Sequence, residues 1–464
     1  MGRNRTLAAL GLVGTLIVAA VGCGSGSSQS SAGQASASTG DGAGTAKKHG
    51  SAANWPTYHA SLGRTAVDRT SPSLGGLRRI WSKQLDGQVY AEPLAVGKRV
   101  YAATENNTVY ALSAGNGKIV WQRHLGTAVD ASTLPCGNIT PVTGITGTPA
   151  ISGNTLYVTA FLSGYRHVLF GLRLNGGKVT LKRNVDAPGS DPRVHQERSA
   201  LSVSKGRVYV PYGGMAGDCG AYRGRVVSVN TEGKAKRRVF TVGVNREGGI
   251  WAPSGAAVDS KGNLFVVSGN GDNTTGFDYG NSVMRLTPKL KQTSFWRPTN
   301  ASQLNRTDTD LGSVGPALLG GGRLFAIGKE GVGVILSTSN LGGIGGQLFQ
   351  ANVCGGGAYG GTAYQAPFLF VPCTDGLVAL RVDGNSFSTA WRSSSFNAGP
   401  PILAGGAVWS IDIDSGTLTA FAPDSGRVLT TQGLDSVTHF ATPSAGGGRL
   451  FAPASSQVIA YVGV

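Results

Sequence analysis

The sequence has few charged residues, few acidic residues in particular, and no apolar run long enough to span a membrane after its first 22 residues. Charged residues make up 14% of the 464 residues, with 24 Asp and Glu against 41 Lys and Arg. This low charge excludes a coiled coil and a disordered acidic chain, which both need many charged side chains. Because about eighteen consecutive apolar residues are needed for a spanning helix, none is expected in the body of the chain.

Several catalytic and metal-binding motifs are also missing. The chain has no C-x-x-C pair, no H-E-x-x-H and no serine in a G-x-S-x-G turn, which excludes a thiolate zinc site and gives no support to a serine hydrolase. The formal charge is +17, but the basic residues are scattered and no nucleic-acid-binding motif accompanies them. We therefore expect no nucleic-acid partner, and at most an attraction to anionic polymers or lipid headgroups.

The first 22 residues predict an export signal. Arg3 and Arg5 precede an apolar run, Leu7 to Val21, that is too short to favour a spanning helix. The run leads into Ala20-Val21-Gly22-Cys23, which resembles a bacterial lipobox, in which the cysteine becomes the acylated first residue. We therefore predict a lipoprotein anchored through Cys23 to the extracytoplasmic face of a bacterial membrane. An ordinary signal peptide, with Cys23 incidental, is the alternative.

The residues that follow the predicted signal are rich in Gly, Ser and Ala and contain almost no large apolar side chain. Such a segment cannot bury enough surface to fold, so residues 23–54 are expected to form a disordered tether. Residues 55–464 are then the folded body.

Five cysteines are present, and four remain if Cys23 is lipidated. An even number in an exported chain indicates two disulfides, with three ways of pairing them. The short separation between Cys354 and Cys373 favours that pair, which leaves Cys136 with Cys219. Free buried thiols are the alternative.

Glycine is plentiful, at 73 residues, and an internal repeat accompanies it. Eight times, an aliphatic residue and then an aromatic residue lie within a short strand-like segment, and the aromatic residues are 39 to 60 residues apart. Four short strands in such a period are typical of a β-propeller blade. The eight instances are Val100-Tyr101, Leu156-Tyr157, Val208-Tyr209, Leu264-Phe265, Leu324-Phe325, Leu369-Phe370, Val408-Trp409 and Leu450-Phe451.

The two ends of the repeat array predict how the ring closes. The eighth repeat stops at Val464, after its third strand, whereas the segment from Leu77 to Leu85 is a fourth strand that lacks a blade of its own. We therefore predict an all-β, eight-bladed propeller with four antiparallel strands per blade, in which this N-terminal strand completes the last blade. A closed ring of this kind is expected to be monomeric.

The segment from Ala111 to Trp121, with sequence ALSAGNGKIVW, resembles the A-x-D-x-x-T-G-K-x-x-W repeat of pyrroloquinoline-quinone (PQQ)-type propellers, with Ser113 in place of the Asp. Weaker copies cover residues 379–391 and 420–430, and Trp55-Pro56-Thr57-Tyr58 resembles the family's lead-in. The resemblance implies that each closing tryptophan packs between adjacent blades. One branch of the family comprises PQQ- and Ca²⁺-dependent alcohol dehydrogenases. Another comprises binding propellers without catalysis, including the lipoprotein subunit of the outer-membrane barrel-assembly machine.

Five positions resemble the parts of the dehydrogenase site. The resemblance makes Trp251 the stacking wall for the quinone, Asn270 and Asp218 calcium ligands, Asp310 the catalytic base and Lys329 the cation beside the quinone. Amide and carboxylate oxygens suit Ca²⁺, a nearby Asp can accept an alcohol proton, and a Lys can stabilise charge on a quinone oxygen. The adjacent Cys–Cys pair that caps the cofactor in many of these enzymes is absent.

A second set of residues is expected where the blade entries converge on one face of the ring, the usual ligand site of such a fold. It consists of His195, Glu197, Arg198, Tyr359 and His439. A water-filled channel with polar walls is the alternative.

The sequence thus supports two functions. We favour a surface lipoprotein whose ring binds a protein, a cell-envelope polymer or a small ligand without catalysis and without a resident cofactor. The alternative is a PQQ- and calcium-dependent alcohol or sugar oxidoreductase that uses the same face.

Overall fold

The computed structural model describes residues 53–71, 76–233 and 237–464. The predicted signal peptide, Cys23 and nearly all of the predicted tether lie outside the described residues. Within them the chain consists of short strands and turns, with one α-helix, α1 (Ala301–Arg306), and three short 3₁₀ turns. No helix in the described part of the chain is long and apolar enough to cross a membrane.

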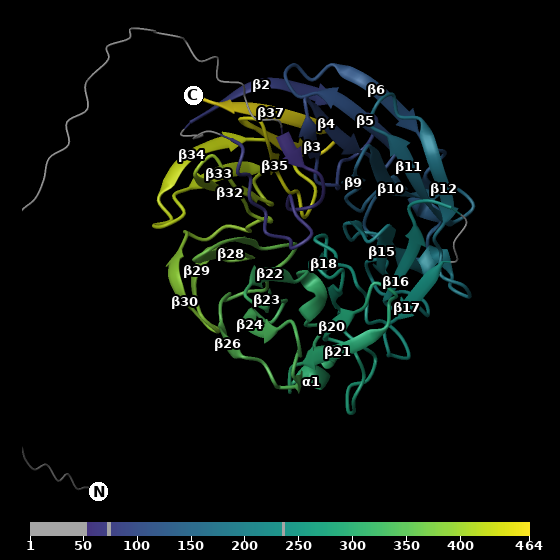
Figure 1. Ribbon diagram of the computed structural model, residues 1–464, viewed down its shortest axis with the longest axis vertical. Helices are drawn as coiled ribbons and strands as arrows, with labels where there is room; N and C mark the ends of the chain where they lie inside the picture. Colours follow the sequence, from purple (N-terminus) through teal and green to yellow (C-terminus); the bar gives the residue numbers. More distant parts are fainter. Residues whose placement is uncertain (1–52, 72–75, 234–236) are drawn as a thin grey trace, which may run out of the picture. The chain divides into compact units, whose positions relative to one another are not determined.

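Eight sheets are arranged around a central axis as the blades of a propeller, with the first strand of each blade inside and the last at the rim (Figure 1). Blades 1 to 4 contain the following strands in order from the axis: β3 (Leu94–Gly97), β4 (Arg99–Ala103), β5 (Thr108–Ser113) and β6 (Ile119–His124); β9 (Ala150–Ser152), β10 (Thr155–Leu162), β11 (Arg166–Arg173) and β12 (Val179–Asn184); β14 (Ser202–Ser204), β15 (Arg207–Gly214), β16 (Arg225–Asn230) and β17 (Arg238–Thr241); β18 (Ala257–Val258), β19 (Leu264–Val267), β20 (Val283–Leu286) and β21 (Gln292–Arg297).

Blades 5 to 8 repeat this pattern. Their strands are β22 (Ala317–Gly320), β23 (Arg323–Ala326), β24 (Val332–Ser337) and β26 (Phe349–Asn352); β27 (Ala363–Gln365), β28 (Phe368–Cys373), β29 (Gly376–Asp383) and β30 (Ser386–Arg392); β31 (Ile402–Ala404), β32 (Ala407–Asp412), β33 (Thr417–Phe421) and β34 (Val428–Gly433); β35 (Ser444–Ala445), β36 (Arg449–Ala454), β37 (Gln457–Gly463) and β2 (Leu77–Gln84). Shorter strands supplement them: β1 (Ala53–Trp55), β7 (Val129–Asp130), β8 (Val142–Thr143), β13 (His195–Gln196) and β25 (Gly343–Ile344).

The predicted closure of the ring is confirmed. Strand β2 pairs antiparallel with β37, from Leu77 opposite Gly463 to Gln84 opposite Gln457. The fourth strand of blade 8 therefore comes from the beginning of the folded body, so backbone hydrogen bonds join an early strand of the propeller to its last strand. All eight repeat aromatics lie in the second strand of their blades, as the repeat predicts.

The rim tryptophans pack between neighbouring blades, as the family resemblance implies. Trp81 of blade 8 donates from Nε1 to the carbonyl of Ala114 in blade 1, and Trp121 of blade 1 does the same to Leu174 in blade 2. A glycine with positive φ lies beneath each ring. A β-carbon on Gly117 would come within 2.8 Å of the Trp81 indole, and one on Gly177 within 2.6 Å of the Trp121 indole, so neither position has room for a side chain. The T-G-K-like turn of one blade thus receives the tryptophan of the preceding blade.

The hydrophobic core lies between the blades rather than in a single centre. In β15, Val208 and Val210 pack in a cluster shared with blade 2, whereas Tyr209 packs in a cluster shared with blade 4. Successive side chains of a strand point to opposite faces of the sheet. Both faces of each blade are therefore buried, which explains why an inner strand such as β19, with sequence LFVV, is apolar without alternation.

The segment before the first blade runs across the ring axis and joins several blades. Its backbone carbonyls accept hydrogen bonds from the first strands of five blades: Pro56 from Ile151, Leu62 from Val258, Gly63 from Leu318, Thr65 from Tyr364 and Ala66 from Leu403. Arg64 is 1% exposed, and its guanidinium donates to the carbonyls of Leu201 and Ala256 in blades 3 and 4. This segment fixes one end of the axis.

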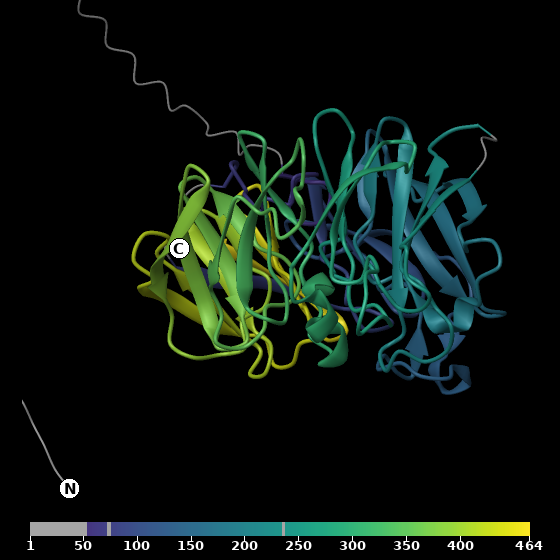
Figure 2. The same cartoon turned by 90° about the horizontal axis from the view of Figure 1, so that it is seen from below.

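Because successive strands of a blade are antiparallel, their turns lie alternately at the two ends of the ring axis. The ring therefore has two different faces, which are at the upper and lower edges of Figure 2. The first and third turns of each blade lie at one end, here called the hairpin face. The second turns and the connections from one blade to the next lie at the other end, here called the cavity face. The N-terminal segment contacts the ends of the inner strands that lead to the hairpin face, so the opposite end of the axis is left for a binding site.

Candidate functional site

A cavity of about 600 Å³ opens on the cavity face. Its walls come from the second turns of blades 3, 4 and 5 and from several connections between blades. Eight of the ten residues predicted from the sequence line it: Arg198, Asp218, Trp251, Asn270, Asp310, Lys329, Tyr359 and His439. These positions are up to 241 residues apart in the chain, and the ring brings them together because each follows or precedes an inner strand of its blade.

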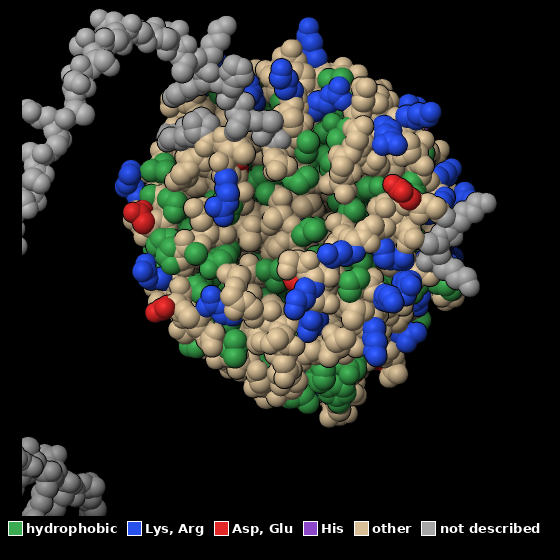
Figure 3. Space-filling model, in the orientation of Figure 1, with side chains coloured by type: hydrophobic (Ala, Val, Ile, Leu, Met, Phe, Trp, Pro, Cys, Tyr) green, Lys and Arg blue, Asp and Glu red, His purple; other side chains and the backbone are tan. Residues whose placement is uncertain are grey.

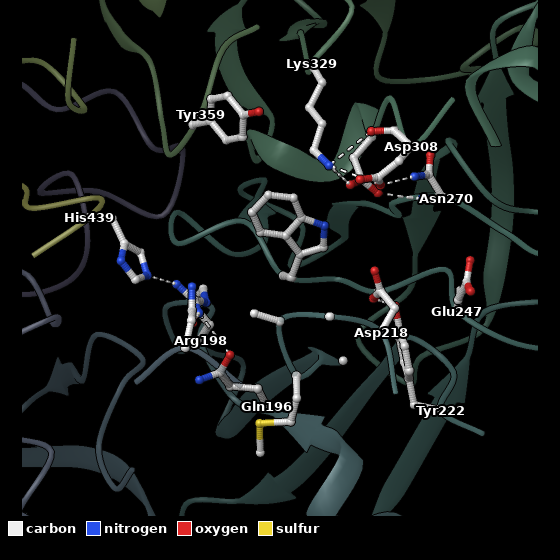
Figure 4. Close-up of a pocket in the computed structure, with 18 of the residues that line it drawn as sticks. Gln196, Arg198, Asp218, Tyr222, Glu247, Asn270, Asp308, Lys329, Tyr359 and His439 are labelled. Atoms are coloured by element: carbon white, nitrogen blue, oxygen red, sulfur yellow. Dashed lines mark hydrogen bonds and ion pairs between the residues drawn. The ribbon is translucent and has the colours of Figure 1, made fainter. Parts of the chain in front are cut away.

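Lys329 and two aspartates form one side of the cavity (Figure 4). Its Nζ lies 2.6 Å from Asp310 Oδ2 and 3.2 Å from Asp308 Oδ1. The backbone N–H of Asn270 donates to Asp310 Oδ1 at 2.7 Å, and its Nδ2 donates to Asp308 Oδ1 at 2.8 Å. Burial raises the pKa of Asp310, although the ammonium beside it opposes this effect. Burial disfavours the charge of Lys329, but Asp310 and Asp308 together raise the pKa of the ammonium.

Aromatic rings form the floor beside this cluster. Lys329 Nζ lies 5.9 Å from the centre of the Trp251 ring, a distance at which a cation is attracted to an indole. Phe440 lies 6.3 Å from Trp251 and is stacked at 6.3 Å on Tyr359, measured between ring centres. Trp251 packs directly against Gly213 of blade 3. A β-carbon added to Gly213 would lie 2.6 Å from Trp251 Cβ, so this close contact requires a glycine. Phe440 is nearly parallel to Tyr359 but tilted by 47° to Trp251, so the indole of Trp251 is a separate aromatic surface of the cavity.

Acidic groups continue along the wall from Asp310. Asp218 Oδ1 accepts a hydrogen bond from the hydroxyl of Tyr222 at 2.5 Å. Burial and the Asp218 carboxylate raise the pKa of Tyr222, so this hydroxyl stays protonated as a donor. Burial and the neighbouring carboxylates Asp218 and Asp310 also raise the pKa of Glu247, although Arg246 opposes them. Together with the side-chain oxygen of Asn270, these carboxylates are hard oxygen donors of the kind that Ca²⁺ takes.

The opposite side of the cavity is cationic (Figure 4). The guanidinium of Arg198 donates from Nη1 to His439 Nε2 at 2.7 Å and from Nη2 to Gln196 Oε1 at 3.0 Å. Burial and then the charge of Arg198 lower the pKa of His439 to about 4, so the imidazole is neutral at pH 7 and accepts the hydrogen bond. The cavity therefore has a cationic pole at Arg198 and an acidic wall opposite it.

Two predicted ligand-face residues, His195 and Glu197, do not line this cavity. His195 turns away, and its Nδ1 lies 2.8 Å from the carbonyl of Asp191. Glu197 is 5% exposed and lies against Gly147, whose β-carbon would come within 2.5 Å of its carboxylate. The physical reason is the two-residue period of extended backbone: Gln196 and Arg198 face the cavity, so the residues before each of them face the other way.

Both predicted disulfides are present, Cys136–Cys219 and Cys354–Cys373. The first joins the connection after blade 1 to the loop that carries Asp218. In this loop Gly217 lies beside Cys136 and, like Asp218, lines the cavity. The second anchors residues 354–358, whose backbone N–H groups at Cys354 and Ala358 donate to Gly331 and Gly328 on either side of Lys329. Each disulfide thus holds one wall of the cavity.

Several lining residues were not predicted from the sequence: Asn138, Met215, Tyr222, Glu247, Asn305, Arg306 and Phe440. Phe440 had a local signal, since it follows His439. Others, such as Asn138 and Arg306, lie in irregular connections, where neither periodicity nor a motif indicates which way a side chain points.

The described geometry defines an eight-bladed β-propeller with a polar and aromatic pocket at the centre of one face. Residues 76–272 match the family model described as "Outer membrane protein assembly factor BamB". The matched residues span blades 1 to 3 and part of blade 4, and the same four-stranded architecture continues through the remaining blades of the described chain. No curated protein matches the chain in sequence.

Solved structures with the same architecture have different functions. A quinohemoprotein alcohol dehydrogenase from Pseudomonas putida is 15% identical with a TM-score of 0.71, covering 89% of this chain and 80% of that chain. A europium-containing methanol dehydrogenase is 16% identical with a TM-score of 0.66, covering 86% and 89%. BamB from Moraxella catarrhalis is 14% identical with a TM-score of 0.57, covering 83% and 100%. At such low identity these likenesses establish the fold alone.

Proposed function

We propose that the protein is a quinone-dependent oxidoreductase that binds PQQ and a divalent cation in the cavity and oxidises alcohol groups. The observation that carries the proposal is the convergence of Trp251, Asn270, Asp218, Asp310 and Lys329, which come from three blades and two connections, in one cavity. A purely structural ring does not require these five side chain types to meet.

The residues present fit such a cofactor and cation by their chemistry. PQQ is a planar tricarboxylate, so an indole wall, a cationic pole at Arg198 and a lysine match its shape and charge. A cavity of about 600 Å³ is within the usual range for small-ligand sites. On the acidic wall, Asn270 and Asp218 would hold the cation through their side-chain oxygens.

The reacting groups of the protein are Asp310 and Lys329. Asp310 is the general base that accepts the hydroxyl proton of the alcohol at its carboxylate, because it is buried and its raised pKa brings it closer to neutral pH. When bound, PQQ would supply a two-electron acceptor. Lys329, held 2.6 Å from Asp310, keeps the base ionised before proton transfer and places a positive charge where the reaction accumulates negative charge.

The test is calorimetric titration of PQQ with Ca²⁺ into the protein, together with a dye-linked alcohol oxidation assay. We expect binding in the micromolar range that is lost in Asn270→Ala, and turnover that is lost in Asp310→Asn while binding remains. Asp414→Asn is the matched control, since this exposed aspartate is on the same face in blade 7, outside the cavity. The absence of PQQ binding by the calcium-loaded protein would exclude the proposal.

A second candidate is a binding propeller without catalysis, which the match of residues 76–272 to an assembly-factor family favours. In this function the cavity or the exposed blade edges would bind a protein or cell-envelope partner. Crosslinking on cells, followed by identification of the captured partner, distinguishes it from the enzyme, because the enzyme needs no stable macromolecular partner.

Either function is proposed for an exported protein held by a lipid on Cys23. Mass spectrometry of the membrane-extracted protein should show an acylated N-terminal cysteine, and Cys23→Ser should release the protein from the membrane fraction. A protein that starts at another residue would contradict the anchor.

A further inference from the structure

The two faces of the ring differ in charge. Exposed lysines lie in the first and third turns that form the hairpin face, among them Lys98, Lys118, Lys178, Lys205, Lys261 and Lys289. Figure 3 shows Lys and Arg side chains spread over this face with few acidic groups among them. Most acidic side chains lie on the cavity face, for example Asp130, Asp191, Asp218, Asp308 and Asp414, whereas a smaller number, including Asp259, Asp383 and Asp424, lie in turns of the hairpin face. The net positive charge is therefore concentrated on one side.

Three of these lysines come together where blades 3 and 4 meet. A β-carbon on Gly262 would lie 2.7 Å from Lys205 Cγ and 3.3 Å from Pro288 Cγ, so the turns that carry Lys205, Lys261 and Lys289 are in contact. The three lysines are therefore carried by adjoining turns, and nothing in the fold requires basic residues in all three turns. Such a cluster favours a ligand that brings negative charge.

An apolar cavity opens on the same face between blades 6 and 7. It has a volume of about 300 Å³ and is lined mainly by apolar residues of these two blades, among them Pro367, Phe368, Leu403 and Pro423, with Asp68 and Gln365 as its polar members. A cavity with these walls suits a hydrocarbon chain. A phosphate- or sugar-based polymer has no group that would fill it.

The described chain also begins at this face. Ala53 is opposite Gly97, in the first turn of blade 1 and next to Lys98. The 52 residues that precede Ala53 include the cysteine predicted to carry a lipid. A lipid anchor before residue 53 would therefore connect to the folded body at its basic face.

We propose that the hairpin face docks on an anionic phospholipid surface, with an acyl chain in the cavity beside Phe368 and the cavity face turned outward. Lysines spread over turns of several blades match the dispersed charge of a lipid surface better than a single polymer strand. The proposal does not depend on what the cavity of the opposite face binds.

The test is sedimentation with phosphatidylcholine vesicles that contain or lack phosphatidylglycerol. The chain from Gly24 to Val464 is used, because it keeps the whole compact unit of residues 50–464 and cannot be acylated. We expect binding only to vesicles with phosphatidylglycerol, and binding that weakens with rising salt. The triple variant Lys205→Gln, Lys261→Gln, Lys289→Gln should bind about a hundredfold more weakly, since each basic residue near an anionic membrane contributes roughly fivefold.

The matched control changes the net charge equally on the cavity face: Arg166→Gln, Arg193→Gln, Arg246→Gln, all exposed. This variant should keep its vesicle binding. An equal loss in both triple variants would overturn the proposal, because net charge alone would then be responsible. Stronger binding to a soluble anionic polymer than to vesicles would also overturn it. Phe368→Ser should reduce the binding that remains at high salt, and unchanged binding there would exclude the acyl-chain contact.

Discussion

Lys329 Nζ lies 2.6 Å from Asp310 Oδ2, and the side chains of both residues are largely removed from solvent. The pair joins the second turn of blade 5 to the connection that leads into this blade. The backbone N–H of Lys329 also donates to the carbonyl of Asp310 at 2.8 Å. The turn and the connection are therefore fixed to each other at two points, and the carboxylate is oriented toward the cavity.

Removing the cation of this pair should destabilise the protein at neutral pH. In Lys329→Met the carboxylate of Asp310 loses its counter-ion while it remains buried, which is expected to cost about 3 kcal/mol. Because the pKa of Asp310 then rises further, the loss should shrink as the pH falls and the carboxyl becomes protonated. Chemical denaturation at several pH values measures it. Lys329→Arg keeps the charge and should lose much less; equal losses in the two variants would show that packing, not charge, matters here.

Gly117 should be essential for the contact between blades 8 and 1. In Gly117→Ala the new β-carbon lies 2.8 Å from the Trp81 ring at a residue with φ of 69°, so we expect a loss of about 2 kcal/mol or more. Gly115→Ala is the matched control in the same turn, since its nearest atom is 3.9 Å away and its φ is not positive. Equal melting temperatures for the two variants would contradict the packing described.

The buried carboxyl of Glu105 should make stability pH-dependent. Burial raises the pKa of Glu105 from 4.5 to about 7, although the N–H of Gly144 opposes the shift. Its contribution to stability is fully present below pH 4.5 and is lost as the pH rises through about 7. Glu105→Gln removes this loss, so its stability relative to the natural protein should increase between pH 4.5 and 8 by up to about 3 kcal/mol. Glu330→Gln, which changes an exposed carboxylate, is the control variant in the same denaturation series.

The two disulfides should contribute unequally to stability. Cys136–Cys219 closes a loop of 83 residues and Cys354–Cys373 one of 19. From the chain entropy of the unfolded state, removing them should cost about 4.5 and about 3 kcal/mol respectively. Paired Cys→Ser variants, compared by denaturant unfolding, measure the difference. The first variant should also weaken ligand binding in the cavity, because Asp218 is next to Cys219. A larger cost for the shorter loop would mean that native-state strain outweighs loop entropy.

The extent to which the site could be predicted differs from residue to residue. Asp310 and Lys329 could be identified because each has a fixed place relative to a repeated strand, and the repeat gives the position of that strand. His195 and Glu197 were expected to line the cavity and do not. Side chains alternate along extended backbone, so the residue at which the extended segment begins decides which of them face the cavity, and the sequence of this connection does not indicate that residue. Glu247 and Arg306 have no periodic pattern around them, and only the packing of their loops brings them to the cavity.

The sequence by itself determined the number of blades and the closing strand. These features depend on local patterns that recur along the chain: an apolar strand, a glycine turn and a tryptophan at fixed spacing. Tertiary structure alone decided which side chains share the cavity and how charge divides between the two faces. Arg198 and His439 are 241 residues apart and meet at 2.7 Å only because eight blades close into a ring. Contacts across the axis depend on the closure of the whole ring, and no local pattern in the sequence records them.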